Sequence, residues 1–161
     1  MEKHKIFLIA LTFVSLALTG CRMNNGDIGE LYGIWVVTEV TVDGEIYEGW
    51  RSDGWNDTFF QFQNNICFVT RTNELYDQET QTGTWEWIED KKLIALNFTH
   101  TDNQFPDNIP GGFLYGSPTW LLLTESRVYN FDVTWDGKRS FVWTTVNSDG
   151  QILTYTMKKT Y

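Results

Sequence analysis

Histidine and cysteine, the usual metal ligands and nucleophiles, are scarce in this chain of 161 residues. His4 and His100 are the only histidines, and Cys21 and Cys67 are the only cysteines. His4 lies in a segment that we expect to be removed on export, which excludes a two-histidine zinc motif such as H-E-x-x-H. The sequence also lacks a C-x-x-C pair, a phosphate-binding glycine loop and a G-x-S-x-G elbow.

His100 is therefore the one histidine from which a catalytic or metal site could be built. It could ligate a metal ion with Asp102 and Asp107, or form a nucleophilic triad with Ser117 and Asp102. A single loop histidine among acids is more often simply solvated, and closeness in sequence is no evidence of geometry. Acids are plentiful, but no pair is singled out by its spacing as a glycosidase pair. We expect no enzymatic activity, no cofactor and no metal site.

The N-terminus has the order of an export signal. Lys3 and Lys5 precede an apolar run over residues 6–18, and small residues follow. The run is too short for a membrane span, which takes about 20 residues, and no second run of this kind follows. We therefore expect residues 1–20 to form a signal helix that is cleaved, and no transmembrane helix in the mature protein.

The residues that end this segment are Leu18-Thr19-Gly20-Cys21. They resemble the lipobox of bacterial lipoproteins, in which the thiol takes a diacylglyceryl group, the signal is removed and the new amine is acylated, with palmitate as a typical chain. The resemblance implies that Cys21 is lipidated and that residues 21–30 tether the domain to a membrane. The alternative is cleavage elsewhere, with Cys21 left as a free thiol.

The anchor also bears on location. Each buried methylene contributes about 0.8 kcal/mol, and stable anchoring needs roughly two chains, which this modification supplies. The residues after Cys21 lack the acidic cluster that resembles surface-export tags. We expect a cell-envelope protein on the outer membrane, with the periplasmic face favoured over the surface.

The charge of the chain argues against nucleic acid as a partner. The formal net charge is −9, and loss of residues 1–20 makes the mature protein more negative still. An acidic protein is not attracted to nucleic acid or anionic lipid at long range, and no basic stripe with interleaved aromatics is present. The acyl chains, rather than charge, would supply the contact with the membrane.

Residues 31–161 are long enough for one domain with a sizeable core. Aromatic residues make up 16% of the chain, and all eight tryptophans follow Cys21. Large rings suit the half-buried face of a sheet, and each removes roughly 150–250 Å² from water when fully buried. Cys67 has no disulfide partner once Cys21 is modified, and its apolar neighbours predict a buried small hydrophobe.

Almost every stretch of the mature chain has the pattern of a strand. Alternation of apolar and polar residues, with turn dipeptides such as Asp43-Gly44 between the runs, indicates successive hairpins. The fold expected is all-β, an antiparallel up-and-down barrel of 8–10 strands, with a sandwich as the alternative. Strands are predicted over residues 32–42, 58–63, 66–72, 83–88, 93–99, 120–124, 127–135, 141–147 and 152–158.

Two irregular segments interrupt the hairpins, residues 49–56 and residues 100–118. The longer one carries all three prolines of the chain, and a loop of this length in a compact domain is usually functional or disordered. Both segments carry aromatic residues. We hypothesise that the two segments flank one mouth of the barrel and form the rim of a binding site.

The first predicted strand opens with Gly33-Ile34-Trp35, directly behind a helical turn expected at residues 28–31. This run resembles the G-x-W motif of lipocalins, whose Trp closes one end of an antiparallel barrel. In lipocalins a basic residue of the last strand lies over this Trp. Lys158 or Lys159 would take that place here, although Arg is usual.

Further segments, 83–85, 120–123, 127–131 and 154–158, resemble the lipocalin-like lipoproteins of gut-type Gram-negative bacteria. The resemblance extends over residues 28–159. It implies a barrel that either binds a ligand or is merely structural.

The leading functional prediction is a non-enzymatic barrel that binds a small apolar or amphipathic molecule among ring-lined walls. The alternative is a module that holds a glycan or a partner protein with exposed loop aromatics, chiefly Trp50, Trp55 and Phe113. For the strand rings the competing interpretation is ordinary core packing. Candidates for the wall or a plug are Tyr32, Trp35, Trp85, Trp87, Phe131 and Trp143, and candidates for the rim are Trp50, Trp55, Phe113 and Tyr115.

Replacement of Cys21 tests the anchor. Cys21→Ser removes the nucleophile that takes the diacylglyceryl group, so the protein should leave the membrane fraction and lose incorporation of labelled palmitate. Cys67→Ala is the matched control and should stay with the membranes. If the Cys21→Ser protein stayed in the membrane fraction, this result would argue against lipidation.

Overall fold

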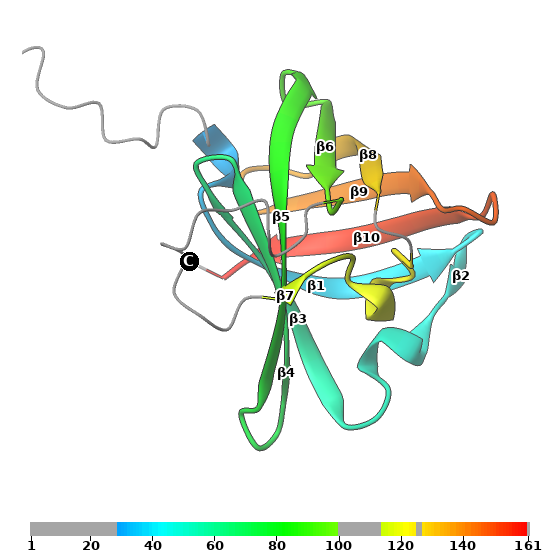
Figure 1. Ribbon diagram of the computed structural model, residues 1–161. Helices are drawn as coiled ribbons and strands as arrows, with labels where there is room; N and C mark the ends of the chain where they lie inside the picture. Colours follow the sequence, from blue (N-terminus) through cyan, green and yellow to red (C-terminus); the bar gives the residue numbers. More distant parts are fainter. Residues whose placement is uncertain (1–28, 100–113, 125–126, 161) are drawn as a thin grey trace, which may run out of the picture.

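The computed structural model describes residues 29–99, 114–124 and 127–160, and these fold into a closed β-barrel (Figure 1). Short 3-10 helices in these described ranges are η1 (Gly29–Leu31), η2 (Glu48–Arg51) and η4 (Thr119–Leu121). The strands are β1 (Gly33–Val42), β2 (Glu45–Ile46), β3 (Trp55–Gln63), β4 (Ile66–Asn73), β5 (Gln78–Glu89), β6 (Leu93–Asn97), β7 (Leu114–Tyr115), β8 (Val128–Trp135), β9 (Ser140–Val146) and β10 (Ile152–Lys159).

Eight strands form the wall, in the order β1, β3, β4, β5, β6, β8, β9 and β10. Each pairs antiparallel with the next, and β10 pairs back with β1 from Leu153 opposite Val42 to Lys159 opposite Trp35. In Figure 1 the red β10 runs beside β1. This last pairing closes the sheet and leaves none of these eight strands as an open edge. The prediction of an up-and-down barrel is confirmed, and the sandwich alternative is wrong.

The alternation of side chains explains why one face of each strand turns inward. On β8, Tyr129, Phe131 and Val133 are buried, while the intervening Asn130 and Asp132 are exposed. The remaining long strands repeat this pattern over much of their length, because successive residues of a strand point to opposite faces. The core is the barrel interior, and the outer face carries the polar residues.

The hairpin turn predicted at Asp43-Gly44 joins β1 to β2. Both residues have positive φ, 51° and 86° respectively. Two consecutive positive φ values match the right-handed twist of the flanking strands, and Asp and Gly adopt them readily. Val42 and Glu45 are accordingly paired on either side of the turn.

The prediction of a strand over residues 120–124 is wrong. Residues 119–121 form η4, in which the backbone N–H of Leu121 donates to the carbonyl of Pro118. Leu122 then has φ 61°, a left-handed conformation that ends the helix and cannot continue a strand. Apolar residues in a short run fit a buried helical turn as well as a strand, and periodicity alone does not separate them.

Two more differences concern β5 and β7. β5 begins at Gln78, earlier than the predicted start at residue 83. Residues 78–82 are polar and show no apolar alternation, but their backbone still pairs with β4. β7 was not predicted, and it runs parallel to β5, with Tyr115 opposite Thr82. It extends the sheet along the part of β5 that the short β6 does not reach.

Cys67 lies on the inward face of β4 and is fully buried, as predicted. Burial raises the pKa of its thiol far above the ordinary value, so the group stays protonated and unreactive. Burial also raises the pKa of the Tyr155 phenol, with smaller contributions from Tyr129 and Tyr47. Both groups are therefore neutral in the folded protein.

The free energy of unfolding should fall as the pH rises above 9. The ordinary pKa values are 9.0 for the thiol and 10.0 for the phenol, so the unfolded chain releases these protons while the folded chain keeps them. Each group adds a slope of at most about 1.4 kcal/mol per pH unit above its ordinary pKa. Urea unfolding at a series of pH values measures this slope. Cys67→Ala should make the fall between pH 9 and 10 shallower, and an equal fall in both proteins would contradict the assignment.

Candidate functional site: the barrel interior and its mouth

Aromatic rings fill the interior of the barrel. Trp143 of β9 is fully buried at the centre of the ring cluster, where its indole meets rings from two other strands and from its own. Its centroid lies 5.1 Å from Phe60, 5.9 Å from Phe62, 5.1 Å from Phe131 and 5.0 Å from Phe141. These are ordinary separations for edge-on and tilted aromatic pairs, which add to the gain from burial.

The rings proposed for the wall fall into two groups. Trp35, Trp85, Phe131 and Trp143 are buried inside, and Trp87 is partly buried against the same core. Tyr32 is 56% exposed and therefore cannot be a wall residue. It precedes β1, where the chain has not yet entered the barrel.

One end of the barrel is closed around Trp35. Its Nε1 donates to the carbonyl of Leu31 in η1 at 2.8 Å. The ammonium of Lys159 lies 5.2 Å from the centroid of the indole and donates to the carbonyl of Glu30 at 3.2 Å. Lys159 thus takes the place that the lipocalin resemblance assigns to a basic residue over this Trp. We call this the closed end.

The other end, the mouth, is filled by the plug, which we define as residues 119–123. Trp120, Leu121 and Leu123 are all buried there. The hydroxyl of Tyr155 donates to the carbonyl of Leu121 at 2.6 Å, and Trp120 Nε1 donates to Thr58 Oγ1 at 3.2 Å. These two hydrogen bonds fix the plug to β10 and β3.

The shorter irregular segment meets the plug, which follows the longer irregular segment, at this mouth. η2, from the shorter segment, is in contact with η4, which directly follows the longer one, and both lie together beside the start of β3 in Figure 1. Trp50 is only 3% exposed, so it is a core residue rather than a solvent-facing one. Trp55 is the first residue of β3 and is partly buried. Phe113 and the side chain of Tyr115 lie outside the described residues.

A polar cluster that the sequence analysis missed lies beside the plug: Arg71, Glu79 and Gln81, named here the mouth cluster. Arg71 Nε donates to Glu79 Oε2 at 2.9 Å, and Arg71 Nη2 donates to the same oxygen. Gln81 Nε2 lies 3.4 Å from Glu79 Oε1. The guanidinium of Arg71 lies 4.3 Å from the ring of Trp55 and 4.6 Å from that of Trp120.

The inward placement of this cluster follows from alternation. Arg71 shares a face of β4 with the buried Cys67 and Val69, and Glu79 and Gln81 share a face of β5 with Trp85. The register of the β4–β5 pair sets Arg71 opposite Glu79. Counting in twos from the buried residues would have found the cluster, once the start of β5 was known.

Two indole N–H groups inside the barrel have no acceptor among the described residues. They belong to Trp85 and Trp143, whose rings lie 5.4 Å and 5.9 Å from that of Phe62. By contrast, the indoles of Trp35, Trp120 and Trp135 each donate a hydrogen bond. A buried donor without an acceptor costs about 1–3 kcal/mol. These two groups are therefore available to an acceptor that is not part of the described chain.

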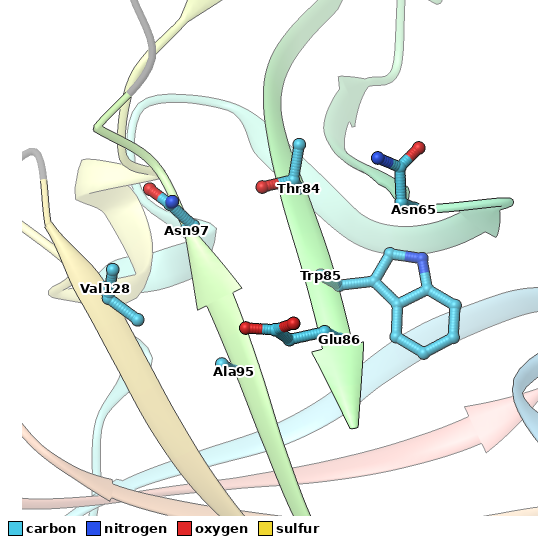
Figure 2. Close-up of a pocket in the computed structure, with 7 residues that line it drawn as sticks. All are labelled: Asn65, Thr84, Trp85, Glu86, Ala95, Asn97 and Val128. Carbon is cyan, nitrogen blue, oxygen red and sulfur yellow. The ribbon is translucent and has the colours of Figure 1, made fainter. Parts of the chain in front are cut away.

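Shallow hollows lie on the outer wall. One of about 360 Å³ lies over β5, β6 and β8, where the small side chain of Ala95 leaves room between longer neighbours (Figure 2). Figure 2 shows the side chains of Glu86 and Trp85 leaving β5 in different directions. Its lining is Asn65, Thr84, Trp85, Glu86, Ala95, Asn97 and Val128. Of the buried rings that the sequence suggested for binding, Trp85 is in this lining, whereas Trp35, Phe131 and Trp143 are not.

Within the described ranges, no three His, Cys, Asp or Glu side chains come together as a metal site. Of the residues considered for a metal site or a triad, His100, Asp102 and Asp107 lie outside the described part of the chain and Ser117 lies within it. Nor does any helix in the described ranges have the length and apolar character needed to cross a bilayer.

No protein family and no curated protein matches the sequence. Solved structures do match the fold. An uncharacterized protein from Bacteroides eggerthii DSM 20697 is 14% identical, with a TM-score of 0.51 over 80% of this chain and 98% of that one. A lipocalin-like protein from Bacteroides uniformis ATCC 8492 is 13% identical, with a TM-score of 0.50 over 81% of this chain and 99% of that one. At these identities the similarity shows the fold alone: a lipocalin-like β-barrel.

Loss of one hydrogen bond should loosen the plug. Tyr155→Phe leaves the buried carbonyl of Leu121 without its donor, at a cost of about 1–3 kcal/mol. Amide hydrogen exchange of Leu121 and Leu122 should speed up roughly tenfold or more. The free energy of unfolding of the whole domain should fall by no more than about 1–3 kcal/mol. Tyr32→Phe, at the closed end, is the control. Equal exchange in both variants would show that Tyr155 does not hold the plug.

Proposed function

We propose that this protein is a lipid-anchored, non-enzymatic carrier that holds a small apolar or amphipathic molecule inside its barrel. The observation that supports this best is the pair of unsatisfied indole N–H groups of Trp85 and Trp143 among otherwise apolar rings. Ligand sites are commonly apolar walls with a few polar groups that orient the bound molecule. A carbonyl or ether oxygen reaching either indole would recover the hydrogen bond that the folded chain forgoes.

The plug supplies a route to the interior. Leu121 and Leu123 are apolar side chains held in the mouth by a segment with two hydrogen bonds to the wall. The alkyl chain of a ligand can replace these side chains with little change in apolar burial. Binding then breaks the plug's two hydrogen bonds, each of which contributes about 0.5–1.5 kcal/mol net to stability. The contacts between the ligand and the aromatic rings offset this loss.

The alternative, a module with exposed loop aromatics, has less support. Trp50 is buried, and the Trp55 ring lies against Arg71 rather than flat to solvent. Catalysis has no support in the described residues either, because the thiol of Cys67 is buried with its pKa raised.

Anchoring at Cys21 would place the mouth away from the bilayer. η1, the first described element, lies at the closed end beside Trp35. The eight residues from Cys21 to Ile28 span at most about 29 Å when extended, because each contributes no more than about 3.6 Å. The closed end would therefore lie near the membrane, with the mouth open to the compartment from which the ligand is taken.

The indoles can be tested with two ligands of matched shape. The full chain carrying Cys21→Ser, which removes the acyl groups, should bind the neutral fluorophore N-phenyl-1-naphthylamine saturably. 2-Dodecanone, which has an acceptor, should displace it roughly 2–10-fold better than dodecane, the effect of one net hydrogen bond. The variant that removes the indole N–H used by the ligand, Trp85→Phe or Trp143→Phe, should abolish this preference. Comparison of the two variants therefore identifies the donor.

Trp35→Phe is the matched control, because it loses an indole N–H that is already bonded at the closed end. It should keep the preference for 2-dodecanone. No saturable binding of the fluorophore would overturn the proposed function. A preference that persists in both interior variants would overturn the role of the indoles.

A further inference from the structure

We propose that the mouth cluster selects an amphiphile whose polar end is a neutral hydroxyl or amide, rather than a carboxylate. This inference rests on the proposed function, since it assumes a ligand in the barrel, and it adds the chemical class of the ligand's head group. Three side chains, Arg71, Glu79 and Gln81, would contact the head group.

The position of the cluster suits a head group. All three side chains face inward on β4 and β5, on the mouth side of Val69 and Gly83, which occupy the next inward positions of these strands. The plug residue Trp120 lies against Arg71. A molecule whose alkyl chain lies among the rings and replaces the plug would therefore bring its polar end to these residues.

Arg71 has donors to spare. Its Nε and Nη2 both bind one oxygen of Glu79, and no acceptor among the described residues binds its Nη1. The stacking of Trp55 and Trp120 on the guanidinium holds this group in place, and its side chain stays 20% exposed. The Nη1 N–H groups are therefore available for an acceptor oxygen.

Gln81 offers an acceptor, whereas Arg71 offers donors. Its Oε1 is buried and has no donor within the described part of the chain. Its Nε2 lies near Glu79 Oε1, so the amide and the guanidinium of Arg71 lie next to the same carboxylate. A buried acceptor without a donor costs about 1–3 kcal/mol, which an O–H or N–H of a ligand would recover.

The charge of Glu79 decides the class. It neutralises Arg71, so the cluster has no net positive charge for an anion. A ligand carboxylate at Arg71 would lie beside that of Glu79, and two like charges at this distance repel each other. A hydroxyl or primary amide has one acceptor for Arg71 and one donor for Gln81, and it brings no charge.

The test compares ligands with the same chain length and different heads. With the Cys21→Ser full chain at pH 8, dodecanol and dodecanamide should displace N-phenyl-1-naphthylamine at concentrations at least tenfold lower than dodecanoate. Glu79→Gln keeps the shape and removes the charge, which leaves Arg71 without a counter-ion. The preference should then move at least tenfold toward dodecanoate. Glu86→Gln makes the same charge change on the exposed outer face of β5 and should leave the order unchanged.

A second variant tests the same assignment in case the Glu79→Gln protein does not fold. Gln81→Leu removes the unsatisfied acceptor, so affinity for dodecanol and dodecanamide should fall roughly tenfold while affinity for 2-dodecanone stays the same. Wild-type selectivity for dodecanoate, or equal responses of Glu79→Gln and Glu86→Gln, would overturn the head-group assignment and leave the barrel a carrier. Failure of every ligand to bind would overturn the proposed function itself.

Discussion

The pairing of β10 with β1 is the constraint on which the rest of the structure depends. It converts a meander with two open edges into a closed wall, so that one face of every strand becomes interior. Lys159 and Trp35, opposite each other in this pairing, also close one end. If the pairing were lost, the rings would face water and the hydrophobic gain that stabilises a domain without a disulfide would be lost with them.

The closed interior divides into regions with different chemistry. At the closed end the buried indole of Trp35 and the neighbouring indole of Trp135 each donate to an acceptor. In the middle, Trp85 and Trp143 have none, and at the mouth Gln81 Oε1 also lacks a partner. Unsatisfied polar atoms in a native core call for an explanation. Their concentration away from the sealed end is explained if the interior and mouth receive a molecule that supplies the missing partners.

Much of the fold could be predicted from the sequence, because side-chain alternation and turn dipeptides are local signals. The inward face of β8 and the turn at Asp43-Gly44 are examples. The plug could not be predicted, since a short apolar run such as residues 120–124 fits either a strand or a helical turn until its tertiary contacts are known. Trp50 looked like a rim residue for a related reason: burial in an irregular segment has no periodic signature.

The candidate site was predicted in part. The inward placement of Trp85, Phe131 and Trp143 could be predicted, because alternate residues of a strand share a face, and their role in binding stays a prediction. The mouth cluster was missed, since charged residues at Arg71 and Glu79 suggest an outward face unless their pairing across two strands is known. Unsatisfied atoms are a property of three-dimensional packing and leave no trace in the sequence.

The most direct test of the central claim, that the inner face of the barrel binds the ligand, is a crystal structure of the protein grown with 12-bromododecanol. The anomalous signal of bromine locates the end of the alkyl chain, even where the electron density of the chain itself is weak. We predict bromine inside the barrel among the rings around Trp143, with the hydroxyl oxygen within hydrogen-bond distance of Arg71 or Gln81 and the plug displaced. Bromine confined to the outer wall, with the plug and the ring cluster unchanged, would contradict the account.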